Sequence, residues 1–297
     1  MIVAMEQGYF PRGSSVLRRV QGERSVGLMY GQRALLIGAL DARNYVGTAQ
    51  HSRYRDRPFK RLSATARMFE TVFFGSKAEA DRVLAAVAGM HRGVEGELPA
   101  DGGAFEAGTP YSAHDPMLML WTIAVAAESS AHFYELLVRP MGAGELDAFW
   151  RDWVRFGELF GMRRDVAPPS WAEFREWFDE RLASEQMGLT DEARRVGRGV
   201  AFKIPVPRLE SPLMEFHNLV LIGTLPERVR NLYGLPWDLR RELAFRAVTT
   251  AVRGSRPLTP RVLARGPNAS RYSRTARIEA ERIEAGRPPI PLPPLQR

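Results

Sequence analysis

Three side chains that could hold an anionic cofactor lie within one stretch of the chain, residues 51–91. Arg61 and Thr65 are four residues apart in a helical pattern, so both lie on one face of that helix. His91 follows Val87 by four residues and extends the apolar face of the next helix. A guanidinium, a hydroxyl and an imidazole would then line one apolar crevice. Such a crevice suits a large anionic ring cofactor, and it equally suits ordinary core with satisfied polar groups.

Two predicted helices, joined by a short turn, must position these residues. Gly75 is predicted to end the first helix. Ser76 and Glu79 then form the capping pattern S-x-x-E, which begins the second helix. The first helix has an apolar face because hydrophobic residues recur at helical spacing. These residues are Phe59, Leu62, Ala66, Phe69 and Phe73.

Composition restricts the chemistry that is open to the chain. It has 297 residues and no cysteine, which excludes disulfides, thiolate metal sites, iron–sulfur clusters and a cysteine nucleophile. A metal must be held by His, Asp, Glu or Tyr, and no two of the five histidines have metal-chelate spacing. The sequence contains no P-loop, dinucleotide fingerprint, nucleophile elbow or H-E-x-x-H motif.

Charge and hydropathy bear on whether the chain binds nucleic acid, is secreted or spans a membrane. The net charge is +8, but the arginines are scattered among acids except near the C-terminus, which favours solvated helix faces over nucleic-acid binding. The first residues, MIVAMEQGYFPRGSS, do not resemble a secretory signal. The longest apolar run, Met117–Ala127, is too short for a membrane span. We expect a soluble cytoplasmic protein without a membrane span, and the sequence leaves its oligomeric state open.

Hydrophobic periodicity predicts an all-α fold with a single globular domain over residues 1–286. A proline-rich tail that is extended or disordered follows at 287–297. Asp115 before a proline predicts the start of a central buried helix. A helical pattern runs from Val26 to about Val46. The acidic, glycine-rich segment 94–110 is predicted to be a loop, either a lid or an ordinary connection.

The remaining histidines have simple interpretations beside functional ones. His51 suits a hydrogen-bonded helix end, and His114 lies next to a helix cap. His132 lies near the end of the central helix, where an imidazole favours the helix dipole. His217 lies in a very apolar helix and belongs either to the core or to a pocket. The segment 269–286 is predicted to be a basic surface helix.

At family level, the chain resembles the bacterial branch of a family of oxygenases. That family groups the ER-bound oxygenase of mycophenolic acid biosynthesis with the catalytic domain of rubber oxygenase (latex-clearing protein). The resemblance covers the chain to about residue 265. Its motifs include GYFPRGSSVLRRVQGERSVGLMYGQRALLIGAL, HSRYRDRPFKRLSAT, FETVFFGSKAEADRVLAAV, MHRGVEGELP, GTPYSAHDPMLMLW, YELLVRPM, FGELFGM and LPERVRNLYGLPW.

The resemblance implies an all-α, partly globin-like fold that binds b-type haem (heme b) and uses dioxygen. Arg61 and Thr65 look like the family's Arg-x-x-x-Thr pair beside the haem, and His91 like the histidine that ligates the iron. The implied function is that of a haem-dependent oxygenase, an oxidoreductase acting on a hydrophobic small molecule. Phe69, Trp121 and His217 are then candidate pocket walls, although each also suits simple core.

The chain departs from the family pattern at several positions. Many relatives carry His-Pro where this chain has Asp41 followed by alanine, and many carry His where it has Thr122. The rubber oxygenase carries a lysine at the place of Ala64 and an upstream carboxylate base. Asp41 and Asp56 are the only acids between residues 41 and 60 here. Two alternatives therefore stay open: a cofactor-free member that binds a hydrophobic ligand, and a haem sensor without turnover.

Overall fold

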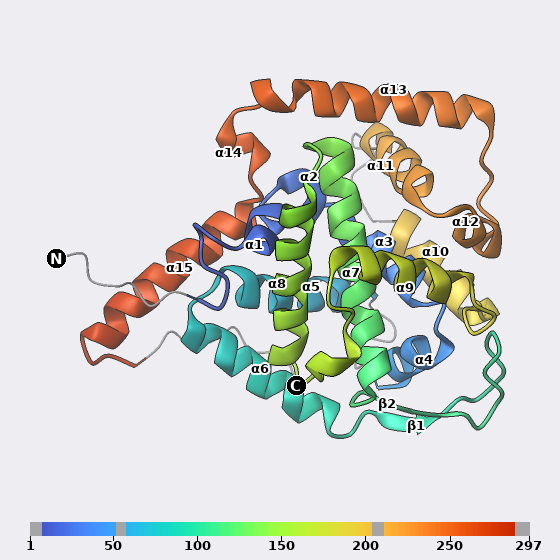
Figure 1. The fold of residues 1–297 in the computed structure, drawn as a ribbon, viewed down its shortest axis with the longest axis horizontal. Helices are drawn as coiled ribbons and strands as arrows, with labels where there is room; N and C mark the ends of the chain where they lie inside the picture. Colours follow the sequence, from blue (N-terminus) through green and yellow to red (C-terminus); the bar gives the residue numbers. More distant parts are fainter. Residues whose placement is uncertain (1–7, 52–57, 204–210, 289–297) are drawn as a thin grey trace.

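The computed structural model describes residues 8–51, 58–203 and 211–288 (Figure 1). Within these ranges the fold is all-α, as the sequence predicts, with one two-stranded sheet added. Most of the buried apolar side chains belong to one large hydrophobic core. None of the described helices is long and apolar enough to cross a membrane.

The core is arranged around α7 (Pro116–Leu137), which lies in the middle of the molecule (Figure 1). Asp115 begins this helix as predicted, because its carboxylate accepts a hydrogen bond from the backbone N–H of Met117 at 2.8 Å. Buried residues occur all around the helix, and it packs against α3 (Tyr30–Gly38) and α8 (Ala143–Leu159). The central buried helix is thus confirmed.

The predicted pair of helices is also confirmed. It consists of α5 (Pro58–Phe74) and α6 (Lys77–His91), which pack on one another. Gly75 separates them, and a Cβ atom there would collide with the backbone carbonyl of Thr71. Both hydrogen bonds of the capping box are formed between Ser76 and Glu79.

The helical pattern from Val26 to Val46 is not one helix. It breaks into α2 (Arg24–Gly27), α3 and α4 (Ala42–Gln50), so this prediction is wrong in detail. Asp41 begins α4 by accepting a hydrogen bond from the backbone N–H of Arg43 at 3.1 Å. A strong N-cap inside an apolar run therefore starts a new helix with a new direction.

The 94–110 segment is more ordered than the predicted loop. Its first residues form β1 (Glu95–Glu97), which pairs antiparallel with β2 (Pro110–Ser112). Tyr111 is buried and belongs to a small second core beside α4. The segment is thus a hairpin whose base packs on the helices.

The C-terminal helix α15 (Pro267–Glu284) is not only a basic surface helix, as the sequence suggested. It packs on α5, and its Glu279 is fully buried. That carboxylate accepts hydrogen bonds from Ser76 Oγ and Arg82 Nη2, both at 2.7 Å. A buried ion pair therefore ties α15 to the start of α6.

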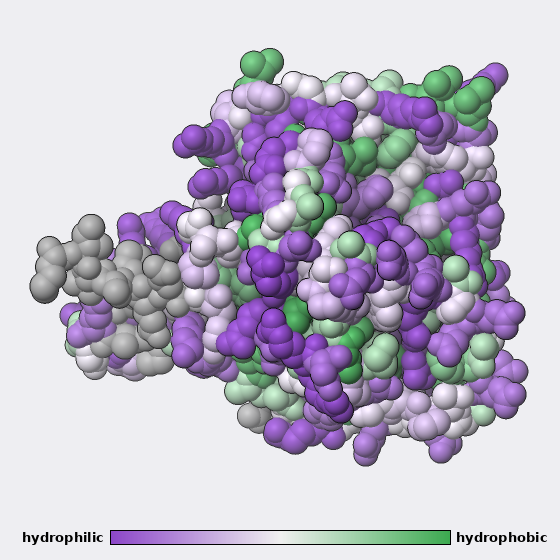
Figure 2. All heavy atoms as spheres, viewed as in Figure 1, coloured by the Kyte–Doolittle hydropathy of each residue, from purple (hydrophilic) through white to green (hydrophobic). Residues whose placement is uncertain are grey.

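The other helices surround this framework, and α13 (Leu239–Ser255) runs along its upper edge in Figure 1. Figure 2 shows apolar residues on the surface at both ends of that edge. The remaining helices are α1 (Val16–Gln21), α9 (Trp171–Ala183), α10 (Asp191–Phe202), α11 (Ser211–Thr224), α12 (Glu227–Tyr233) and α14 (Arg261–Ala264), with short 3₁₀ turns η1 (Arg164–Val166) and η3 (Arg256–Leu258).

Candidate functional site

His91 is the last residue of α6 and is half-buried. Val83 and Val87 precede it on the same face, and both are buried. Burial lowers the pKa of His91, and the neighbouring His114, whose ring centroid is 6.5 Å away, lowers it further. The imidazole is therefore neutral at pH 7, which is the form that binds a metal.

Arg61 and Thr65 lie half-buried in the first two turns of α5. Burial lowers the pKa of Arg61, and Tyr45 on α4 is the neighbour that opposes this shift. Tyr45 has a pKa raised to about 12, chiefly by burial and then by Glu192. Within the described residues, Arg61 has no ion pair with a carboxylate.

These three predicted site residues lie at the ends of α5 and α6 that are away from the Gly75 turn. No hydrogen bond or ion pair joins any two of Arg61, Thr65 and His91 in the part of the chain that the structure describes. Arg61 has Tyr45 as a neighbour, whereas His91 has His114. The donors nevertheless fit a haem in their chemistry, because an iron takes a neutral imidazole and a propionate takes a guanidinium.

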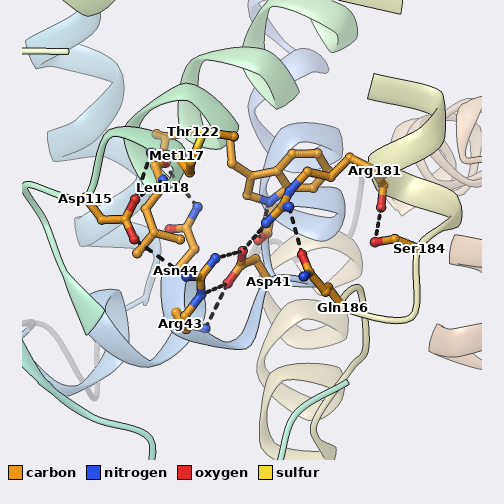
Figure 3. A network of polar contacts seen from close by, with 12 residues as sticks. Asp41, Arg43, Asn44, Asp115, Met117, Leu118, Thr122, Arg181, Ser184 and Gln186 are labelled. Atoms are coloured by element: carbon orange, nitrogen blue, oxygen red, sulfur yellow. Dashed lines mark hydrogen bonds and ion pairs between the residues drawn. The ribbon is translucent and has the colours of Figure 1, made fainter. Parts of the chain in front are cut away.

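Asp41 and Thr122, where the family resemblance leads us to expect histidine, belong to a polar network (Figure 3). Asp41 is fully buried and accepts hydrogen bonds from Arg43 Nη2 at 3.0 Å and Arg181 Nη2 at 3.1 Å. Asn44 of the same helix donates to Thr122 Oγ1 at 3.2 Å. The network links α4 to α7 and α9. Its carboxylate is occupied by two guanidinium groups, while Asp56 lies outside the described residues.

Of the candidate pocket walls, Phe69 and Trp121 lie in packed core. The Phe69 ring centroid is 4.8 Å from that of Phe156. Trp121 is fully buried, donates from Nε1 to the carbonyl of Gly38 at 3.1 Å and stacks on Phe178. Their contacts are therefore with protein side chains.

His217 differs from these two residues because one of its ring nitrogens is buried without a hydrogen-bond partner among the described residues. Its Nδ1 lies 3.2 Å from Asn218 Oδ1. The buried nitrogen is Nε2. Burial lowers its pKa, so this ring is also neutral at pH 7.

Two open hollows on the described surface lie elsewhere. The larger, of about 770 Å³, lies between α10 and α12 and is lined by Arg194, Arg198 and Tyr233 among others. The smaller, of about 410 Å³, lies beside α9. None of Arg61, Thr65 and His91 lines either hollow. No cluster of three or more His, Asp or Glu side chains suited to a metal occurs in the described ranges.

A buried ion pair at the centre of the molecule was missed by the sequence reasoning. Arg33 and Glu128 are both buried, and Arg33 Nη2 donates to Glu128 Oε1 at 3.1 Å. Arg33 Nε also donates to the carbonyl of Thr224 at 3.1 Å. Arg175 of α9 reaches the same carboxylate at 3.1 Å. The signal in the sequence was an acid, Glu128, directly after the apolar run Met117–Ala127.

His132 lies one turn after Glu128 and is neutral rather than a cation at the helix end. Burial is the largest cause of its lowered pKa of about 4, followed by the charge of Arg33. Its ordinary pKa is 6.5. Between these two values the unfolded chain holds a proton that the folded chain does not. The free energy of unfolding therefore decreases as the pH falls through this window.

We expect His132→Gln to make that pH dependence shallower, because the variant loses one of the groups that resist protonation in the fold. Urea unfolding at a series of pH values from about 4 to 7 measures it. His91 and His217 also have lowered pKa values and keep part of the slope. His51→Gln, at a solvent-exposed position, is the control. Equal slopes in the wild type and His132→Gln would contradict the assignment.

One of the comparisons with known proteins identifies a family. The family described as ER-bound oxygenase mpaB/B'/rubber oxygenase, catalytic domain, matches residues 18–254. The chain therefore belongs to this family of oxygenase catalytic domains. The matched region contains α5, α6 and α7, while α14 and α15 lie beyond it. No curated protein and no solved structure matches the chain.

Proposed function

We propose that the protein is a haem-dependent oxygenase that acts on a hydrophobic small molecule, with the iron held by His91. The observation that carries this proposal is the half-buried, neutral imidazole at the end of α6 in a member of an oxygenase family. Haem b, when bound, would supply an iron that reacts with dioxygen. The localisation that we propose remains cytoplasmic.

The chain's own residues would bind and orient the cofactor. His91 is neutral at pH 7 because burial lowers its pKa, so a ring nitrogen can donate its lone pair. Arg61 carries a positive charge that no described carboxylate neutralises, which suits a porphyrin carboxylate. Thr65 lies one turn further along α5 and would offer a hydroxyl on the same face.

The proposal is tested with full-length protein produced with added iron and haem precursor. The absorption spectrum should show a Soret band. Apolar candidate substrates should then be converted only when dioxygen is present. A folded protein that stays colourless and does not take up haemin would end the proposal. A coloured protein without dioxygen-dependent product would be a haem sensor or carrier instead.

Arg61→Gln is expected to weaken haemin binding about tenfold, because one charge-assisted hydrogen bond to a buried carboxylate is lost. The dissociation constant from a haemin titration measures the effect. Arg67→Gln is a matched control, since Arg67 is exposed on the same helix. If both variants bind haemin as tightly as the wild type, the proposed role of Arg61 is wrong.

A second candidate is a cofactor-free member that binds a hydrophobic ligand. The network in Figure 3 favours it, because Asp41 and Thr122 take part in structural hydrogen bonds at positions where many relatives carry histidine. This candidate predicts a colourless, folded protein. Apolar molecules retained through purification from cell extract, and identified by mass spectrometry, would then define its ligand.

A further inference from the structure

The α13 edge of the molecule exposes an unusual number of large apolar side chains. We use the term outer edge for residues 239–265, which comprise α13, η3 and α14. Five of the eleven exposed large hydrophobic residues of the described chain lie in it. They are Leu239 (72 % exposed), Leu243 (58 %), Leu258 (85 %), Val262 (77 %) and Leu263 (56 %).

The outward apolar face of α13 is separate from the face that packs on the core. Phe245, Val248 and Val252 are partly buried and contact the main core. Leu239 and Leu243 are one helical turn apart and point away from that packed face. Exposed alanines at Ala247 and Ala251 continue in the same direction. The helix therefore carries apolar side chains on its free side as well as on its packed side.

The same outer edge is strongly basic. It contains seven arginines and one acid, Glu242, which gives a net charge of +6. Arg246 forms an ion pair with Glu242, and Arg256 with Glu23 at 2.7 Å. Arg240, Arg253 and Arg261 are exposed, and none of the three has an ion pair within the described residues. Uncompensated positive charge thus surrounds the exposed leucines.

We propose that the outer edge docks onto an anionic lipid surface. Exposed apolar side chains enter the boundary between headgroups and acyl chains, while arginines beside them attract acidic headgroups. A second copy of this chain is a poorer partner, because a two-fold interface would bring the two +6 edges together. Nucleic acid would neutralise the arginines but would leave the leucines in water. The inference is independent of whether haem is bound.

Co-sedimentation with vesicles tests the proposal. The full chain should bind vesicles of phosphatidylcholine with equimolar phosphatidylglycerol, and bind far less to phosphatidylcholine alone. Added salt should weaken the binding, since the attraction is screened over about 10 Å at 0.1 M ionic strength. No binding to the anionic vesicles at low salt would overturn the proposal.

Paired sets of variants locate the surface. Arg240→Gln with Arg253→Gln and Arg261→Gln should lower the partition coefficient about 100-fold. Exposed arginines elsewhere provide the control set, Arg12→Gln with Arg92→Gln and Arg151→Gln, which removes the same charge. Equal losses from the two sets would mean that overall charge, and not the outer edge, determines binding.

The apolar contribution needs its own test. Leu239→Gln with Leu243→Gln should lower the partition coefficient roughly 100-fold, about tenfold for each leucine. Met90→Gln, at a residue 51 % exposed on α6, should leave it unchanged. If the leucine variant instead converts a dimer to a monomer in analytical ultracentrifugation, while vesicle binding is unaffected, the occupant is a second copy and the proposal fails.

A direct readout of contact is available because the chain has no cysteine. A polarity-sensitive fluorophore attached to Leu243→Cys should shift its emission to shorter wavelength when anionic vesicles are added. The same fluorophore on Met90→Cys should not shift. A shift at Met90 alone would place the lipid contact on α6 and would contradict the inference.

Discussion

His91→Ala is expected to abolish the Soret band of the haem-loaded protein. The imidazole is the only side chain that we assign to the iron, and its loss would remove the one coordinate bond from the protein to the cofactor. Loss of a residue that only hydrogen-bonds to a metal ligand costs about 10–100-fold in metal affinity. Loss of the ligand itself should therefore cost at least about 100-fold. Haemin titration followed by absorption measures the change.

Two other histidines sharpen this experiment. His51→Ala is the first control, because His51 is exposed and its Nε2 lies 3.1 Å from the hydroxyl of Tyr111. His114→Ala is the second, because its ring is the neighbour of His91. We expect both to keep the band. If the band is retained in His91→Ala and lost in His114→Ala, the iron ligand is His114, and our assignment to His91 is wrong.

Arg33→Ala is expected to destabilise the protein strongly. It leaves the buried carboxylate of Glu128 without its main partner, and breaking a buried pair in this way costs about 3–5 kcal/mol. Since whole domains are stable by about 5–15 kcal/mol, the variant should be close to unfolding. The urea midpoint at pH 7 measures the effect.

The matched double variant separates charge from packing. Arg33→Met combined with Glu128→Leu removes both buried charges and should be more stable than Arg33→Ala. Arg277→Ala is a surface control, because its i,i+4 pair with Glu281 is exposed and should contribute less than about 0.5 kcal/mol. If Arg33→Ala unfolds at the wild-type midpoint, Arg33 has no structural role at the centre of the core.

The outer edge and the candidate site lie on different elements. Arg61 and His91 belong to α5 and α6, whereas the exposed leucines and free arginines belong to α13, η3 and α14. The two proposals can therefore fail separately. Vesicle binding by a colourless protein would support the lipid surface alone, and a Soret band in a protein that ignores vesicles would support the haem alone.

Local features of the sequence determined much of the fold. Three helix boundaries depend only on atoms a few residues apart: the capping box at Ser76 and Glu79, the helix end at Gly75 and the N-cap at Asp115. They can therefore be predicted from the sequence without knowledge of tertiary contacts. The all-α class follows from the same helical periodicity. The resemblance rests on the order and spacing of short motifs, and the family model matches residues 18–254.

The tertiary structure alone decided which polar residues meet. Arg33 and Glu128 are 95 residues apart, and Ser76 and Glu279 are 203 apart, so no local pattern pairs them. The same holds for Arg181 and Asp41, which are 140 residues apart. Long-range contacts depend on how helices pack, and packing is set by the whole core. For that reason the sequence identified His91 and Arg61 as candidates, and the fold supplied their neighbours, His114 and Tyr45.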